Sequence, residues 1–243
     1  VSKDKDDSEN IYVGTPLING KLDKSVRKIN YNTLTDGKDN GDSIWIKQGI
    51  ELYKDDIEIK NYLYYQDLDS EARRPYRALQ ITNTDKVSIV GTDITQEQKL
   101  IGNRLDLIHK GNIFGLDNKF LIGSNVSKMN FKRDASSGGT GIVTNIYNPI
   151  SGTHGDLGNN YEVKDREVDV EQIAIYLEDS LSLSDNLKLI LGLRHDTLDV
   201  DWDYLQTNDK RSKTHNEFSY RAGLVYDLTD TTTLYASYST SIE

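Results

Sequence analysis

Two groups of aspartates have the residue type and spacing that could bind a metal ion. Asp199, Asp201 and Asp203 alternate along the chain, so an extended strand would place their carboxylates on one face. A second group lies within Asp36–Asp42, next to two glycines. Carboxylate oxygens are the ligands that Ca²⁺ prefers, but neither group has the residue order of a calcium-binding loop. We therefore interpret both groups as solvated acidic segments and predict no metal ion.

The other motifs with possible chemistry are incomplete. The segment Ser136–Gly141 is rich in glycine, but it lacks the Lys-Ser/Thr pair of a phosphate-binding loop. The four histidines are scattered without metal-ligand spacing, and none of the 39 acidic residues stands out as half of an acid–base couple. The absence of cysteine excludes disulfides and thiol catalysis. We predict no catalytic residue and no cofactor, and an enzyme is the class that the sequence supports least.

The composition excludes some classes and leaves a β-rich protein. The formal net charge of −10 argues against nucleic acid as a partner, because no basic stripe is present to meet phosphates. No run of about 18 apolar residues occurs, which excludes a transmembrane helix. A transmembrane β-strand needs only about 9–11 residues, and half of them face a polar interior. The 15 tyrosines fit strands and membrane–water boundaries.

Alternation of apolar and polar residues with a period of two dominates the chain. The clearest case is Leu187–Asp196, in which four leucines fall on one face and mostly polar residues on the other. Similar patterns cover Ile173–Glu178, Phe218–Asp227 and Leu234–Ser239. Four earlier strands are predicted at 43–54, 57–68, 97–109 and 118–131. The sequence therefore predicts an all-β protein of about eight strands.

The predicted strands are joined alternately by short and long connections. The short ones are Lys54–Asp56, Lys110–Asn118, Ser184–Asn186 and Thr229–Thr231. The long ones are 69–96, 132–168 and 203–214, and the polar lead-in 1–42 resembles a fourth. Short turns at one end and long loops at the other are typical of outer-membrane barrels, whereas a compact soluble domain seldom contains such loops. We therefore predict an antiparallel transmembrane β-barrel segment with short periplasmic turns and long extracellular loops.

The order of several short motifs resembles the middle of the barrel of TonB-dependent siderophore receptors. In that family a Tyr-Leu-x-Asp strand end precedes Leu-x-Leu-Gly-x-Arg-Tyr-Asp, then Arg-Ala-Gly-Leu-x-Tyr, then Tyr-Ala-Ser-Tyr-Ser. The corresponding segments here are Tyr176–Asp179, Leu189–Asp196, Arg221–Tyr226 and Tyr235–Ile242. His195 and Ile242 replace the usual aromatic residues. Upstream, Val13–Lys21 and Asn145–Gly152 are similar to loop segments of ferrichrome-type and related hydroxamate receptors.

The resemblance implies a fold and a function. Transporters of this kind have about 22 strands around a plugged lumen, so residues 1–243 would form a partial barrel domain without the plug and the C-terminal strands. The parent protein would reside in the bacterial outer membrane, among lipid and lipopolysaccharide. It would take up a ferric siderophore, with hydroxamate type favoured, when the TonB–ExbB–ExbD system acts through the plug. We expect an open antiparallel sheet with alternate apolar residues on its convex face, and a compact two-sheet sandwich would contradict this.

The resemblance also places candidate ligand-binding residues. Aromatic residues near the first loop segment and in the loop after the predicted strand 57–68 correspond to Tyr12 and Tyr76. Three arginines in the same loop could meet an anionic siderophore or a lipopolysaccharide phosphate, namely Arg73, Arg74 and Arg77. Trp202 and Tyr204 extend the strand that begins at Leu187 toward the outer rim. Each of these seven residues has an alternative interpretation as a girdle or loop-packing residue.

Two other functional classes share part of the pattern. A passive porin-like channel would have the same alternation, but it needs no plug and no ordered Leu-Gly-x-Arg-x-Asp series. A soluble β-rich binding module would bury the leucine face of 187–193 in a core instead of in lipid, and it would stay monodisperse without detergent.

Overall fold

The computed structural model describes residues 1–8, 14–31, 37–81, 84–137, 141–153 and 164–240. Within these residues the chain is all-β and contains no helix, and hence none that could cross a membrane. The strands are β1 (Ser2–Ser8), β2 (Lys38–Lys54), β3 (Ile57–Gln80), β4 (Lys86–Ile113), β5 (Leu116–Ser137), β6 (Ile142–Asn145), β7 (Lys164–Ser184), β8 (Leu187–Tyr204), β9 (Asp209–Thr229) and β10 (Thr232–Ser239).

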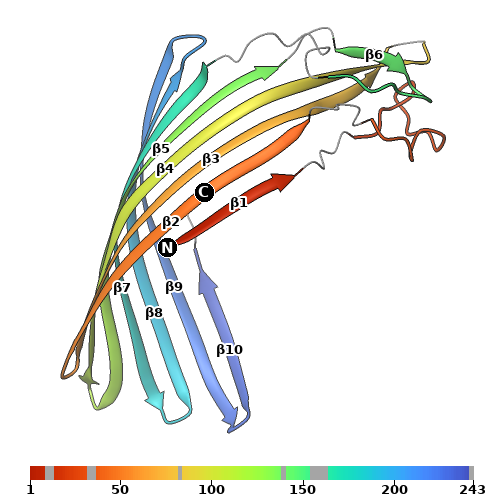
Figure 1. The fold of residues 1–243 in the computed structure, drawn as a ribbon. Helices are drawn as coiled ribbons and strands as arrows, with labels where there is room; N and C mark the ends of the chain where they lie inside the picture. Colours follow the sequence, from red (N-terminus) through yellow and green to blue (C-terminus); the bar gives the residue numbers. More distant parts are fainter. Residues whose placement is uncertain (9–13, 32–36, 82–83, 138–140, 154–163, 241–243) are drawn as a thin grey trace.

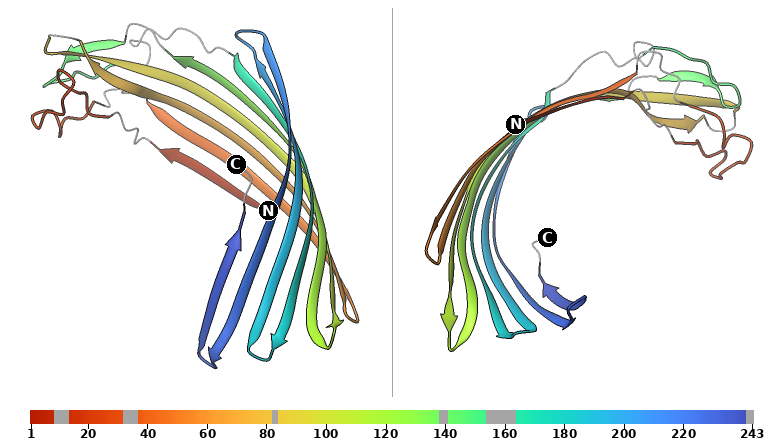
Figure 2. Two further views of the ribbon diagram at one scale, coloured as in Figure 1. Left: turned by 180° about the vertical axis from the view of Figure 1, so that it is seen from behind. Right: turned by 60° about the horizontal axis from the view of Figure 1, so that its bottom comes forward.

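The ten described strands form one antiparallel sheet. Nine of them follow in the order β1-β2-β3-β4-β5-β7-β8-β9-β10, and the short β6 pairs with the beginning of β4. The sheet curves into a wall whose edges are β1 and β10, as Figures 1 and 2 show. An open, curved antiparallel sheet is the architecture that the sequence predicts for part of a large barrel, and no second sheet lies against it in the described part of the chain.

The eight predicted strands correspond to β2–β5 and β7–β10, and the sequence did not predict β1 or β6. The lower ends of the strands are joined by two-residue turns, at Asp55–Asp56, Phe114–Gly115, Asp185–Asn186 and Asp230–Thr231. Phe114 and Gly115 both have positive φ, of 54° and 82°, which is the conformation of a type I′ hairpin turn. The link predicted at 110–118 is therefore shorter than expected, because both strands continue to this turn.

Two of the predicted long loops are wrong. Residues 69–96 are not a loop, because β3 runs to Gln80 and β4 starts at Lys86. Residues 203–214 shrink to a turn at 205–208 between β8 and β9. The alternation fades in these stretches because both faces of the strands are polar there, while backbone pairing continues without any pattern in the side chains.

The two faces of the wall differ sharply. One row of directly paired residues crosses seven strands on the outer face and defines an apolar belt, and it consists of Leu52, Ile59, Leu107, Ile122, Leu177, Leu193 and Tyr220. All seven side chains are exposed, from 37% for Leu177 to 59% for Leu52. On the opposite, concave face Asp106, Ala174 and Asp196 are buried. Apolar groups outward and polar groups inward is the arrangement of a barrel whose outer face meets lipid.

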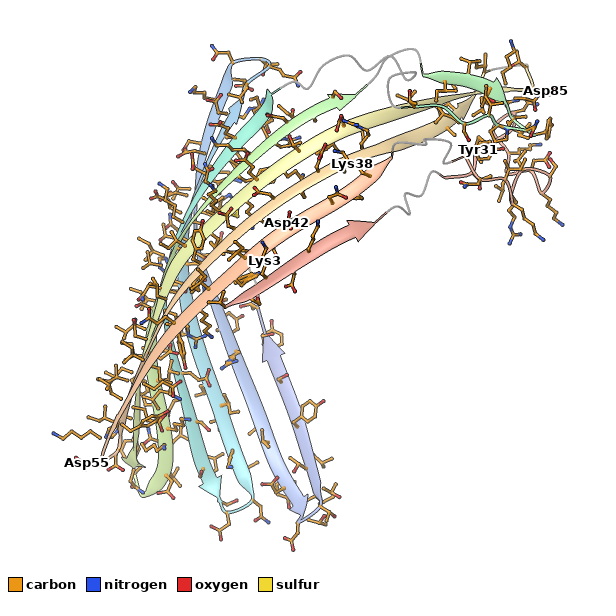
Figure 3. All side chains as sticks on the ribbon, in the orientation of Figure 1. Lys3, Tyr31, Lys38, Asp42, Asp55 and Asp85 are labelled. Atoms are coloured by element: carbon orange, nitrogen blue, oxygen red, sulfur yellow. The ribbon has the colours of Figure 1, made fainter. Side chains whose placement is uncertain are left out.

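The hydrophobic core of the described residues lies where the ends of β3 and β4 meet the loops. Seven buried residues from three distant segments pack together at one end of the sheet, namely Val26, Tyr31, Ala78, Val87, Ile89, Ile142 and Ile146. The hydroxyl of Tyr31 donates a hydrogen bond of 2.6 Å to the carbonyl oxygen of Ile146. We call this unit the loop lobe and define it as residues 14–31, the β3–β4 tip (78–91) and 141–153. Figure 3 shows Tyr31 in the loop lobe and Asp55 at the opposite end of the wall.

Candidate functional site

An Arg-x-Asp pattern occurs twice on the inner face and brings two ion pairs to one tyrosine. On β4 the Nε of Arg104 donates to Asp106 at 2.9 and 3.1 Å, and on β8 Arg194 binds Asp196 through two bonds of 2.6 Å. Tyr176 of β7 lies between them. Its hydroxyl donates to Asp106 at 2.5 Å, and its ring centroid is 5.4 Å from the Arg104 guanidinium and 5.6 Å from that of Arg194. We call these five residues the mid-wall cluster.

A glycine positions this tyrosine. Gly123 of β5 is paired directly with Tyr176, and a Cβ on Gly123 would lie 2.3 Å from the tyrosine ring and 2.7 Å from Asp106 Oδ1. Gly102 and Tyr64 repeat the same arrangement on β4 and β3. Strand glycine permits this close approach because it has no side chain. The rings therefore lie flat against the inner wall, and Tyr176 is held where both guanidinium groups reach it.

Two open hollows border the mid-wall cluster. One has a volume of about 300 Å³ and the other about 700 Å³, and Arg104, Tyr176 and Arg194 line both. Lys47 and Lys60 add positive charge to the larger hollow. The ammonium of Lys47 lies 4.4 Å from the centroid of the Tyr62 ring. The middle of the inner wall therefore combines aromatic rings with ion pairs, because Lys60, Arg104 and Arg194 each approach a carboxylate.

A second basic and aromatic group lies higher on the same face, at the ends of β7, β8 and β9. Tyr204 is sandwiched between two guanidinium groups, with Arg166 at 5.9 Å and Arg211 at 5.4 Å from its ring centroid. Trp202 is paired directly with Arg211 across the two strands. Arg211 binds Asp209 through bonds of 2.7 and 2.9 Å, and this carboxylate raises the pKa of Arg211.

Arg133 of β5 completes this group. It is paired directly with Arg166, and both arginines approach Asp165, at 3.4 and 3.1 Å. The Nε of Arg133 is buried and donates to no protein acceptor. We call Arg133, Arg166, Trp202, Tyr204 and Arg211 the upper inner cluster. It combines flat aromatic surface with guanidinium donors, which can bind a planar or negatively charged ligand.

The structure brings together only two of the seven predicted ligand-binding residues. Trp202 and Tyr204 lie side by side in the upper inner cluster. Arg73 lies on the opposite face, where it binds Asp93 at 3.2 and 3.3 Å. Tyr12 lies outside the described residues. The other three belong to β3, but their side chains lie outside the described part, and they are Arg74, Tyr76 and Arg77. All seven assignments stay predictions.

The aspartates that alternate near the end of β8 share one face, as the sequence predicts. Asp199, Asp201 and Asp203 lie on the outer face above the apolar belt. Asp199 accepts a hydrogen bond of 2.5 Å from Thr214, and Asp203 binds Lys210 at 2.7 Å and raises its pKa. The described residues contain no group of three or more His, Cys, Asp or Glu arranged to hold a metal ion. Asp36, in the second aspartate group, lies outside the described residues.

Most of the charged members of both clusters were not among the residues that the sequence predicts for the site. The repeated Arg-x-Asp at Arg104 and Arg194 was the available signal, because its side chains face away from the apolar residues of the same strands. No comparable signal marks Arg166 or Arg211, which lie in segments where polar residues occupy both faces. Only the register between strands shows that they flank Tyr204.

Comparison with known proteins identifies the class. Residues 4–243 match the family of TonB dependent receptor-like β-barrels, and the chain therefore belongs to this family. Its members are transport receptors of the bacterial outer membrane and not enzymes. Because the chain belongs to this family, the two alternative classes, a passive porin-like channel and a soluble binding module, no longer apply.

A curated relative and two solved structures give the detail. The chain is 29% identical over 122 residues to the probable TonB-dependent siderophore receptor PiuA of Acinetobacter baumannii, a match that covers 48% of this chain and 16% of the relative. The fold is similar to that of the ferric-catecholate import receptor Fiu of E. coli K12, with a TM-score of 0.73, 15% identity and coverage of 86% of this chain and 34% of Fiu. The pyoverdine receptor FpvA of Pseudomonas aeruginosa PAO1 gives a TM-score of 0.68 at 19% identity, with coverage of 89% and 31%. The chain thus spans about a sixth of its curated relative and about a third of the solved receptors.

Proposed function

We propose that this chain forms part of the barrel of a receptor that imports a ferric siderophore in a TonB-dependent manner. The single observation that carries the proposal is the upper inner cluster, in which Tyr204 lies between two guanidinium groups on the inner wall of a family barrel. Siderophore receptor, ferric-catecholate receptor and pyoverdine receptor are the descriptions of PiuA, Fiu and FpvA. These descriptions support the cargo class and leave its chemical type open.

The finer proposal is a hydroxamate siderophore. It is supported by the similarity of 13–21 and 145–152 to loop segments of hydroxamate receptors. The arginines of the upper inner cluster support a chelate that also carries negative charge at its periphery, since guanidinium groups bind carboxylates strongly. Trp202 and Tyr204 would supply the apolar contact area, and each has few rotatable bonds to immobilise.

Binding and release, without bond-making chemistry, would be the task of these residues. A chelate held at the upper inner cluster is still on the extracellular side, above the mid-wall cluster. Movement past the wall would require the plug, which the resemblance places outside these 243 residues, and the TonB–ExbB–ExbD system acting on it. The apolar belt would contact lipid, and the charged outer face above it would contact lipopolysaccharide.

The test is uptake of ⁵⁵Fe by cells that lack their other siderophore receptors and express the intact receptor from its own gene. The panel comprises ferrichrome, ferric aerobactin, ferric enterobactin, ferric pyoverdine and ferric citrate. We expect uptake of at least one hydroxamate chelate, and we expect it to stop when tonB is deleted. Uptake of only non-hydroxamate chelates would overturn the finer proposal. Absence of TonB-dependent uptake for every chelate would overturn the proposed function.

Substitution of the cluster sharpens the test. Tyr204→Ala removes the ring between the two guanidinium groups, and we expect at least about fivefold weaker chelate binding, since an aromatic residue that anchors a ligand contributes more than about 1 kcal/mol. Tyr226→Ala is the matched control, because Tyr226 lies on the outer face of the same hairpin, paired with Leu187 and Leu234. Equal losses of binding in the two variants would contradict a role of the upper inner cluster.

A further inference from the structure

The loop lobe carries an exposed cluster of cations. Lys21, Lys24, Arg27 and Lys28 are all exposed, and they lie within eight residues of the chain. The segment is held at two points, because Val26 and Tyr31 are buried in the core of the loop lobe. We call these four residues the basic tip.

The charges of the basic tip have no ion-pair partner among the residues that the structure describes. None of its four cations forms an ion pair or hydrogen bond within the part of the chain that the structure describes. Asp23 is the acidic residue within the segment, and its Oδ1 accepts hydrogen bonds from Ser25 N at 2.8 Å and Ser25 Oγ at 2.7 Å. These bonds lower the pKa of Asp23 and keep its carboxylate on Ser25. Some basic residues of the extracellular half are paired, such as Lys128 with Glu171 at 2.7 Å.

The height of the basic tip limits which anions can reach it. On the outer face of β3, above Ile59 of the apolar belt, the last aromatic residue before an acidic run is Tyr65, whose hydroxyl donates a hydrogen bond to Asp67. From there β3 continues for about 15 residues to Gln80, which accepts a hydrogen bond of 2.7 Å from Asn19 N of the loop lobe. At about 3.3 Å per residue, this stretch of β3 is roughly 50 Å long and separates the basic tip from the belt along the strand. Lipid phosphates lie near the edge of the belt. Because the Debye length is roughly 8 Å at physiological salt, their field is screened over a separation of this size.

We propose that the basic tip is a capture surface that steers an anionic ferric chelate from the medium toward the receptor mouth. This inference rests on the proposed function and narrows its cargo to negatively charged chelates. Clustered charge of one sign raises the local concentration of an oppositely charged ligand and increases its association rate. The upper inner cluster presents three arginines farther in, with Asp165 and Asp209 as their carboxylate partners, so a chelate drawn by the tip meets further guanidinium donors at the wall. The tip therefore acts on the association rate, and the upper inner cluster on dissociation.

The experiment measures association and dissociation rates of the intact receptor by stopped-flow tryptophan fluorescence. The probes are ferric enterobactin, ferric citrate, ferric aerobactin and ferric pyoverdine, which are anionic, and ferrichrome, which is neutral. The variant combines Lys24→Gln, Arg27→Gln and Lys28→Gln. For an anionic chelate that binds, we expect the association rate at about 20 mM salt to fall about tenfold, the dissociation rate to stay unchanged, and the difference to vanish at about 500 mM salt.

A matched control removes the same charge at the other end of the wall. It combines Lys54→Gln, Lys119→Gln and Lys188→Gln, three exposed lysines near the periplasmic turns. We expect its association rate to equal that of the unsubstituted receptor. An anionic chelate whose association is unaffected by the tip variant, or affected equally by the control, would overturn the inference and leave the proposed function standing. Binding of ferrichrome alone would also overturn it, whereas failure of every chelate to bind would overturn both.

Discussion

The wall and the loop lobe are stabilised in opposite ways. The wall has long backbone ladders but exposes its largest apolar side chains, among them Ile50, Leu52 and Ile173 at more than half of their surface. The loop lobe has few ladder bonds but buries seven residues in a core. Exposed apolar groups cost free energy in water and none in hydrocarbon. The stability of the wall therefore depends on the surrounding lipid, whereas the stability of the loop lobe depends on its own packing.

The largest effect is expected from a substitution that removes part of the core of the loop lobe. Ile89→Ala deletes three buried carbons beside Tyr31 and Ile146, and we expect a loss of about 2–5 kcal/mol from the local free energy of unfolding. Val143→Ala in the same lobe, where Val143 is half exposed, should cost far less. Hydrogen exchange of the amides in 86–91 measures the change. If exchange accelerates equally in the wall strands, the loop lobe is not an independent unit.

The next largest effect is expected from a substitution that places a charge in the apolar belt. Ile122→Arg should destabilise the receptor in bilayers by about 2–4 kcal/mol, because its guanidinium would enter hydrocarbon. Ser127→Arg is the control on the inner face of the same strand, where a charged side chain meets polar neighbours. Guanidinium titration of the receptor in lipid vesicles compares the two variants. Similar costs for both substitutions would mean that the two faces are wrongly assigned.

A smaller effect is expected from a substitution that tests the close contact between Gly123 and the ring of Tyr176. Gly123→Ala places a methyl group on the tyrosine ring and on Asp106, and displacement of the ring should break the hydrogen bond between them. In a double-mutant cycle with Tyr176→Ala we expect a coupling of about 1–3 kcal/mol, since the two residues are in contact. Gly223→Ala is the control, because a Cβ there meets no atom closer than 3.6 Å. Additive costs of Gly123→Ala and Tyr176→Ala would exclude the close contact.

The smallest effect is a pH dependence confined to the loop lobe. Burial raises the pKa of Tyr31 above its usual value near 10, with a smaller contribution from Tyr147. The folded lobe therefore favours the protonated phenol. Its contribution to stability is fully present below about pH 10 and is lost as the pH rises through the folded-state pKa. Proteolysis of the lobe between pH 8 and 11 measures this, and Tyr31→Phe should abolish the dependence. An unchanged pH profile in Tyr31→Phe would show that another group titrates.

Much of the fold could be predicted because its signals are local. The leucines of 187–193 fix a strand and its lipid-facing side, and Asp185–Asn186 marks a turn, without reference to any other part of the chain. The paired rows of the belt follow once those strands are aligned. Above the belt this signal ends, because neither face meets lipid. There the sequence predicts loops, whereas the structure has the end of β3 at Gln80 and the β8–β9 hairpin.

The candidate site could be predicted only in part. Trp202 and Tyr204 were found from a resemblance to a family and from their place at the end of a strand. Their neighbours Arg166 and Arg211 were not found, because an arginine in a polar segment carries no sign of which aromatic ring it will meet. The pairing register of β7, β8 and β9 decides that both arginines contact the ring of Tyr204.

The resemblance of its ordered motifs to a family implied the class of protein, and by itself the sequence determined the strands, their short turns and the lipid-facing side. These properties depend on alternation with a period of two and on turn residues, which act over a few residues. Only the tertiary structure decided that Tyr176 donates a hydrogen bond to Asp106, 70 positions away in the sequence. The same holds for the hydrogen bond from Tyr31 to Ile146 in the loop lobe, across 115 positions. Contacts of this kind are set by pairing partners and by curvature of the sheet, which no local pattern records.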